Sequence, residues 1–232
     1  MRKGVLISAV ACLVACHNYN LDGKLTAALQ NSEIAAGKKY TVFVSANSIQ
    51  IASGSTWTAA AGSSIGSCGS AGSQLAIADC ACSYWASAAG LGTQFRAWIS
   101  DSANDAICRL TGVNGTGCQV SGASQGPYYN LSGGLNGSQR KLVFNSLAEI
   151  AAGAAPASAV AYQENGNLSA ATAVVTGTLT TGRVDNTGHC TDWSSGGANT
   201  YRVGDPTSTT AWTQGGTGAC SASAAPLYCF EY

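Results

Sequence analysis

The stretch from Ser73 to Ala89 decides the fold, and it reads SQLAIADCACSYWASAA. Apolar residues recur in it at steps of three and four, the spacing of one face of an α-helix: Leu75, Ala78, Cys82, Trp85 and Ala89. Gly90 and Gly92 follow directly, and glycine is typical of the position after a helix end. The stretch predicts one amphipathic helix over residues 73–89 that packs its apolar stripe against a core.

The two cysteines of this helix must have different partners. Cys80 and Cys82 are two positions apart, so their side chains point about 200° from each other around the helix axis. Cys82 lies on the stripe with Trp85 and is expected to face the core. Cys80 is expected to face away from it, toward the Gly- and Ser-rich loop that carries Cys68.

Eight cysteines follow Cys16, an even number that is typical of a disulfide framework in an exported chain: Cys68, Cys80, Cys82, Cys108, Cys118, Cys190, Cys220 and Cys229. The segment between Cys108 and Cys118 is rich in glycine and can fold back, which favours a local bridge. The last three cysteines must then provide one mutual pair and one partner for Cys82. Paired C-x-x-C spacings are missing, so a zinc site is not expected.

Three further segments are typical of short strands. Residues 40–44 are rich in β-formers, residues 95–99 place Phe95 and Ile99 on one face, and residues 227–230 are a third candidate. The sequence thus favours an α+β domain with few helices and many loops.

Two weaker helical patterns accompany these strands. A short helix is expected near residues 25–36. Residues 141–152 have the spacing of another helix, although Val143, Phe144 and Ile150 also suit a strand.

The chain begins with the pattern of a secretory leader. Arg2 and Lys3 precede an apolar run of 12 residues, which is too short to span about 30 Å of hydrocarbon. The run ends in Leu13-Val14-Ala15-Cys16, which resembles the bacterial lipobox, in which the cysteine becomes the acylated first residue. We therefore expect a signal peptide at 1–15, a lipidated tether at 16–39 and a domain at 40–232, attached to the outer membrane or cell surface through Cys16.

The composition is unusual for a soluble protein. Half of the 232 residues are Ala, Gly, Ser or Thr, and 9% are charged, against about 25% in ordinary proteins. Without the leader, nine Lys and Arg oppose eleven Asp and Glu. Binding of nucleic acid through a basic surface is excluded by this balance.

Several short blocks together resemble one bacterial family. The front blocks are residues 88–92 (AAGLG), 95–98 (FRAW) and 99–102 (ISDS), and Gly126-Pro127-Tyr128 follows. The closing blocks are residues 176–178 (TGT), 190–195 (CTDWSS), 211–213 (AWT) and 227–231 (LYCFE). This pattern is similar to that of a lipoprotein domain of unknown function that is related to endostatin and C-type lectins and includes the leptospiral endostatin-like surface proteins. The family's usual tryptophan-containing segment is missing from residues 122–175.

This resemblance implies a C-type-lectin-like fold with two particular disulfides. One joins the first helix to the final strand, here Cys82 with Cys229, and the other closes the late loops, here Cys190 with Cys220. It also implies a binding protein rather than an enzyme, with host extracellular-matrix or serum partners such as laminin, fibronectin or complement factor H.

Two alternatives to a protein-binding adhesin stay open. One is a carbohydrate-binding module, and the other is a structural envelope protein without a ligand. Five aromatic residues lie among polar loop residues, where exposed rings would bind a sugar or a protein; otherwise they belong to the core: Trp57, Tyr128, Tyr129, Tyr201 and Trp212.

Metal and cofactor sites are not expected. The calcium-binding triplets of C-type lectins are missing, and the scattered acids and amides near residues 164–167 and 185–192 are interpreted as turn residues. The zinc and heparin sites of endostatin do not transfer, because the chain has only His17 and His189 and its arginines are dispersed.

Catalysis has one candidate base, His189, which lies near Asp185 and Asp192. Two stretches match the Gly-x-Ser-x-Gly nucleophile elbow by letter, residues 62–66 and 122–126. Neither lies between a predicted strand and a predicted helix, so both are interpreted as loops.

Overall fold

The computed structural model describes residues 37–51, 57–121, 124–135, 139–194, 199–221 and 223–232. The predicted leader, Cys16 and the helix expected near residues 25–36 lie outside these residues. The described part is a mixed α+β structure with short strands, few helices and four disulfides.

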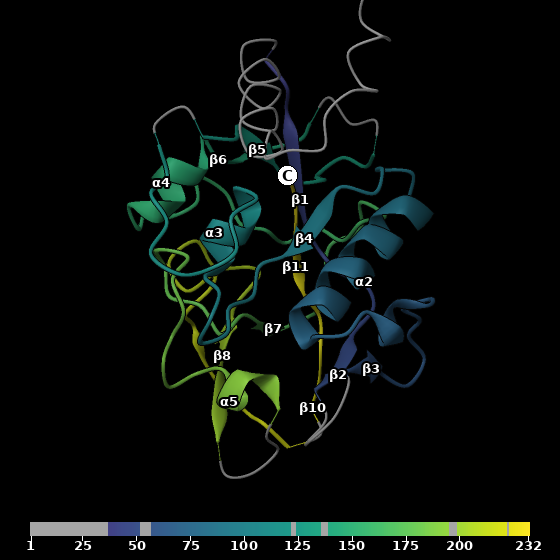
Figure 1. Cartoon of the computed structure of the whole chain (residues 1–232). Helices are drawn as coiled ribbons and strands as arrows, with labels where there is room; N and C mark the ends of the chain where they lie inside the picture. The colour runs from purple at the N-terminus through teal and green to yellow at the C-terminus, as the bar shows by residue number, and fades with distance from the viewer. Residues whose placement is uncertain (1–36, 52–56, 122–123, 136–138, 195–198, 222) are drawn as a thin grey trace, which may run out of the picture.

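A five-stranded sheet lies at the centre of the molecule (Figure 1). Its strands, in spatial order, are β4 (Phe95–Ala97), β11 (Tyr228–Glu231), β1 (Tyr40–Val44), β5 (Tyr128–Tyr129) and β6 (Leu142–Phe144). β1 pairs antiparallel with β11, with Val42 opposite Phe230. The first and last strands of the domain therefore lie side by side at its centre.

The predicted amphipathic helix is α2 (Gln74–Ala88). It begins after Ser73, whose hydroxyl accepts a hydrogen bond from the amide of Ala76 at 3.2 Å. It ends before Gly90, whose φ of +78° suits the left-handed position that glycine favours after a helix. Asp79 accepts a hydrogen bond from the amide of Ala97 at 2.9 Å and so joins the helix to β4.

Two hydrophobic clusters cover opposite faces of the sheet. One packs α2 against Phe43, and the other packs α3 (Ala106–Leu110) and α4 (Leu147–Ala151) against Tyr40 and Val42. In Figure 1, α2 accordingly lies on one side of β1 and β11, and α3 and α4 on the other. The buried aromatic rings are divided almost equally, with six in the first cluster and seven in the second.

Two smaller sheets complete the described structure. One has the order β10 (Ser223–Ala225), β2 (Ile49–Ile51), β3 (Thr58–Ala59), and the other has β7 (Val174–Val175), β8 (Thr200–Gly204), β9 (Gly216–Ala219). The remaining short elements are a 3₁₀ turn, η1 (Cys68–Ser70), and α5 (Cys190–Trp193).

The helix expected over residues 141–152 is wrong in its first half. Residues 142–144 form β6, because Val143 and Phe144 are buried where the strand pairs with β5. Ser146 then has extended backbone, and its hydroxyl accepts a hydrogen bond from the amide of Glu149 at 3.2 Å, which starts α4. The strand expected over residues 95–99 is likewise shorter and ends at Ala97.

The disulfides join Cys68 to Cys80, Cys82 to Cys229, Cys108 to Cys118 and Cys190 to Cys220. These are the pairs expected above. Cys82 and Cys229 are fully buried, as the position of Cys82 on the apolar stripe requires.

Candidate functional site

Four of the five candidate aromatic residues belong to the core. Trp57, Tyr128, Tyr201 and Trp212 are each at most 4% exposed, so their rings are not available as stacking platforms. Trp57, for example, lies edge-on against Trp193 at a centroid distance of 5.2 Å. A chain with so few large side chains needs these rings in its core, which is why they are buried and not exposed in the loops.

The fifth, Tyr129, is half-buried on β5. The ammonium group of Lys39 lies 5.4 Å from the centre of its ring, a distance typical of a cation–π contact. Tyr129 is not among the lining residues of the cavities described next.

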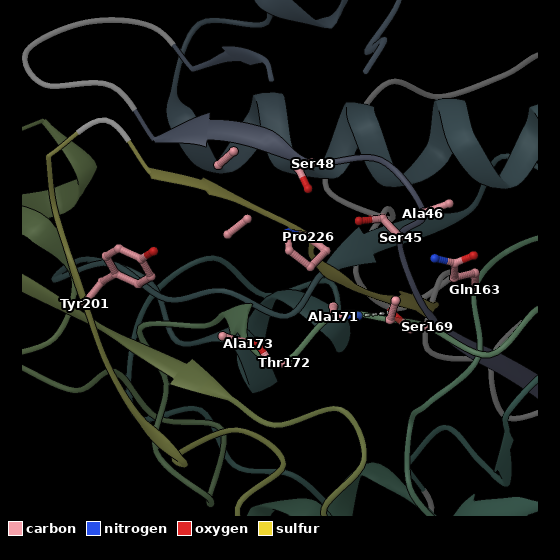
Figure 2. Close-up of a pocket in the computed structure, with 13 residues that line it drawn as sticks. Ser45, Ala46, Ser48, Gln163, Ser169, Ala171, Thr172, Ala173, Tyr201 and Pro226 are labelled. Carbon is pink, nitrogen blue, oxygen red and sulfur yellow. Dashed lines mark hydrogen bonds between the residues drawn. The ribbon is translucent and has the colours of Figure 1, made fainter. Parts of the chain in front are cut away.

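A groove lies between the turn after β1, the edge strand β10 and the segment 169–173 (Figure 2). Its volume is about 440 Å³, and none of the described residues that line it is charged. Tyr201 lies at one end and Gln163 at the other (Figure 2). The lining residues are Ser45, Ala46, Ser48, Gln163, Ser169, Ala170, Ala171, Thr172, Ala173, Tyr201, Ala224, Ala225 and Pro226.

Local hydrogen bonds hold the walls of the groove. The hydroxyl of Ser45 accepts from the amide of Leu227 at 2.9 Å and donates to the carbonyl of Asn47 at 2.6 Å. On the opposite wall, the hydroxyl of Ser169 accepts from the amide of Ala171 at 3.2 Å. The walls are therefore fixed by backbone-directed contacts, and the small side chains of alanine and serine leave the space between them open.

Several polar side chains of the groove have no hydrogen-bond partner among the described residues. Within the described residues, the side chains of Ser48, Gln163 and Thr172 make no hydrogen bond. On its outer side β10 has no neighbouring strand in the described sheet, since it is bonded only to β2. Hydroxyl, amide and strand-edge groups are thus available to an uncharged ligand.

The candidate catalytic base lies in a different cavity, of about 330 Å³, beside α5. Nδ1 of His189 accepts a hydrogen bond from the amide of Asp192 at 2.9 Å and lies 3.2 Å from Oδ1 of the same residue. Both carboxylate oxygens of Asp192 accept from Ser102, at 2.6 Å from its amide and 2.7 Å from its hydroxyl. His189 and Asp192 therefore fix the shape of this loop.

The backbone of α5 is unusual. Cys190, Thr191, Asp192 and Trp193 all have positive φ, from 50° to 63°, so this element is one left-handed turn. Such a turn costs about 1–2 kcal/mol per residue outside glycine. The indole of Trp193 donates to the carbonyl of Ser100 at 2.8 Å and fixes the turn to the core.

The acids considered as calcium ligands act inside the protein. Asp185 accepts from Arg202, and it accepts from the amide and hydroxyl of Thr187 at 3.0 and 2.8 Å. Burial alone would raise the pKa of Asp185, but these hydrogen bonds outweigh it and hold the pKa below its ordinary value. Asn165 accepts from the amide of Asn167 at 2.9 Å, as a turn residue does. Among the described residues, no group of three His, Cys, Asp or Glu side chains is placed to hold a metal.

Neither serine of the elbow-like stretches has the surroundings of a nucleophile. The hydroxyl of Ser64 accepts from the amide of Gly66 at 3.3 Å within a loop. That of Ser124 accepts from the amide of Ala148 at 2.8 Å, close to the start of α4.

Sequence reasoning missed Tyr84, whose side chain is 41% exposed on α2. Tyr84 lines a further cavity with Asn47, Glu164 and Asn165. The signal was present, since Tyr84 is two positions from Cys82 and hence lies on the face of the helix opposite the stripe.

No protein-family model matches the sequence, and no curated protein matches it. In the described part of the chain, no helix combines the length and the apolar character needed to cross a membrane.

Proposed function

We propose that this protein is a lipid-anchored surface protein with a C-type-lectin-like domain, which binds an extended segment of a host extracellular-matrix or serum protein in the groove. The lipobox-like Leu13-Val14-Ala15-Cys16 supports the anchor. The antiparallel pairing of β1 with β11 and the bridge from α2 to β11 support the lectin-like architecture.

The observation that carries the binding function is the uncharged groove beside the free edge of β10. A polypeptide in extended conformation can add to a strand edge through its backbone, and small lining side chains allow that backbone to come close. Ala224 and Ala225 supply the strand edge, and Ala170 to Ala173 supply the small residues on the facing wall. The side-chain amide of Gln163 and the hydroxyl of Ser48 are placed to bind side chains of the partner.

The chemistry of the groove favours binding over catalysis and peptide over sugar at this place. The described residues that line the groove include no acid, base or thiol. Tyr201, the one aromatic residue among the described lining residues, is 4% exposed and packs on Trp193 at a centroid distance of 6.0 Å, so it offers no stacking face.

The experiment is solid-phase binding of the oxidised full chain to laminin, fibronectin and complement factor H. We expect saturable binding to at least one of them that persists in a chelator and changes less than about twofold between 0.1 and 1 M salt, because no charge lines the groove. Ala170→Trp fills the groove at an exposed position and should weaken binding at least about tenfold.

The matched control is Ala103→Trp, which places the same side chain at an exposed position outside the groove. It should leave binding unchanged. Equal binding by both variants, a requirement for calcium, or absence of saturation with all three proteins would overturn the proposal.

A further inference from the structure

A second cavity adjoins the groove across a shared ridge. Ala46, Ser48 and Gln163 line the groove, whereas their chain neighbours Asn47 and Glu164 line the second cavity. This Tyr84 pocket has a volume of about 320 Å³, at the lower end of small-molecule sites. Its lining residues are Asn47, Ser64, Tyr84, Trp85, Ala88, Ala89, Glu164 and Asn165.

The ring of Tyr84 is held in place while part of it stays exposed. Gly66 lies against one edge of the ring, and a Cβ at Gly66 would come within 2.9 Å of Cε2 of Tyr84. The neighbouring Trp85 is 2% exposed, and its indole donates to the carbonyl of Ser64 at 2.6 Å. The small side chains of Ala88 and Ala89 leave the space beside the ring open.

Glu164 is the one charged residue among the described residues that line the Tyr84 pocket. It is 6% exposed, and its Oε2 accepts a hydrogen bond from the amide of Ala46 at 2.8 Å. Within the described residues no side chain bonds its Oε1, although burial raises the pKa of this carboxyl above its ordinary value. The hydrogen bonds that the structure gives this carboxyl come from backbone amides, those of Ala46 and of Glu164 itself. A buried carboxylate at a cavity wall that is bonded in this way is a strong acceptor for a ligand hydroxyl.

Further polar groups of the pocket are also unused. In the described part of the chain, the side-chain amide of Asn47 and the hydroxyl of Tyr84 make no hydrogen bond. Asn165 uses its Oδ1 to accept from Asn167, which leaves its NH₂ group as a donor. The pocket thus offers donors from two amides, an acceptor from Glu164 and an aromatic edge or face from Tyr84.

We propose that the Tyr84 pocket binds one neutral pyranose unit of a glycan. The apolar C–H groups of the sugar would pack on the ring of Tyr84. Adjacent sugar hydroxyls would donate to Glu164 and accept from the amides of Asn47 and Asn165. A neutral sugar fits better than an acidic one, because the only charge lining the pocket is a carboxylate. This site is independent of the groove and of the peptide proposed to bind there.

The experiment is saturation-transfer NMR with the full chain carrying Cys16→Ser, probed with the methyl glycosides of glucose, galactose, mannose and N-acetylglucosamine. We expect saturable transfer to at least one glycoside at millimolar concentration. Tyr84→Ser should weaken it about tenfold or more. Glu164→Gln, which keeps an acceptor for the amide of Ala46, should weaken it about threefold.

Two controls separate this site from others. Tyr232→Ser removes another partly exposed tyrosine outside the pocket and should leave sugar binding unchanged, as should Ala170→Trp in the groove. Absence of transfer to all four glycosides, or equal transfer with Tyr84→Ser and Tyr232→Ser, would overturn the proposal without affecting that for the groove.

Discussion

The helix-and-sheet region (α2 with β1, β4 and β11) and the late-loop region (residues 176–220) are held together by different interactions. In the first, a 15-residue helix packs on strands that form regular backbone pairs, and one disulfide joins helix to strand. The second contains the short strand pair β8 with β9 and one disulfide, and its loops are held by side chains that bond to backbone: Asp192 to Ser102 and Trp193 to Ser100. The first region has a periodic sequence pattern that a reader can find, and the second does not.

Removing single disulfides is expected to give the largest differences in the free energy of unfolding between the two regions. Cys82–Cys229 closes 147 residues, Cys190–Cys220 closes 30 and Cys108–Cys118 closes 10. Loop-closure entropy then gives about 5, 3.6 and 2.7 kcal/mol of stabilisation, respectively. We expect Cys82→Ser to lower the free energy of unfolding most, followed by Cys190→Ser and then Cys108→Ser, in urea titrations under oxidising conditions. Equal midpoints for the three variants would contradict the comparison.

Replacing a buried arginine is expected to give the next largest decrease in the free energy of unfolding. The guanidinium of Arg109 is 5% exposed, pairs with Asp79 of α2 and donates to the carbonyl of Ile99 at 2.6 Å. Arg109→Met would leave the carbonyl of Ile99 without this donor and Asp79 without its cation, although Asp79 keeps the bond from the amide of Ala97. The substitution should cost about 3 kcal/mol.

The matched variant in the late-loop region is Arg202→Met. Arg202 pairs with Asp185 and is 27% exposed, and Asp185 keeps its bonds to Thr187. We expect a cost of about 1.5 kcal/mol in the same urea titration. A larger loss for Arg202→Met than for Arg109→Met would show that the late loops carry more of the stability than this comparison allows.

A substitution in the left-handed turn α5 is expected to change the free energy of unfolding less, and to raise it. Thr191 has a φ of +50°, and its exposed side chain accepts one hydrogen bond, from Asn199 at 3.0 Å. Asparagine tolerates this backbone conformation better than threonine, so Thr191→Asn should raise the free energy of unfolding by about 0.5–1 kcal/mol. Thr200→Asn, an exposed position on β8, is the control and should be neutral or slightly destabilising. A loss of stability for Thr191→Asn would contradict the inference that the backbone at Thr191 is strained.

What the sequence could predict follows the same division. The spacing of Leu75, Cys82 and Trp85 predicted α2, and the opposite directions of Cys80 and Cys82 indicated their different partners. The split of residues 141–152 into β6 and α4 could not be predicted, because a strand of three residues and a helix of five are too short to show a period.

The sites were harder to predict than the core. The groove is built from small residues far apart in sequence, such as Ser45, Ser169 and Ala224, which have no distinguishing pattern. Burial of Trp57 and Trp212 depends on tertiary packing, so their polar sequence neighbours left both a surface position and a core position open. Tyr84 could have been found from the helix periodicity alone.

The smallest expected effect is a dependence of the free energy of unfolding on pH. Two acids, Asp185 and Glu164, contribute to this dependence with opposite signs. The pKa of Asp185 is lowered in the folded state, so its contribution to stability is present above the ordinary carboxyl pKa and is lost as the pH falls through the folded value. The pKa of Glu164 is raised, so the folded protein is favoured at low pH and loses stability as the pH rises through the folded value. In urea titrations between pH 3 and 7, the deficit of Asp185→Asn relative to the wild type should therefore grow with pH, whereas Glu164→Gln should gain on the wild type. Because both carboxyls lie in the same protein, parallel pH profiles for the two variants would mean that the hydrogen bonds from Arg202 and Thr187 do not outweigh the burial of Asp185.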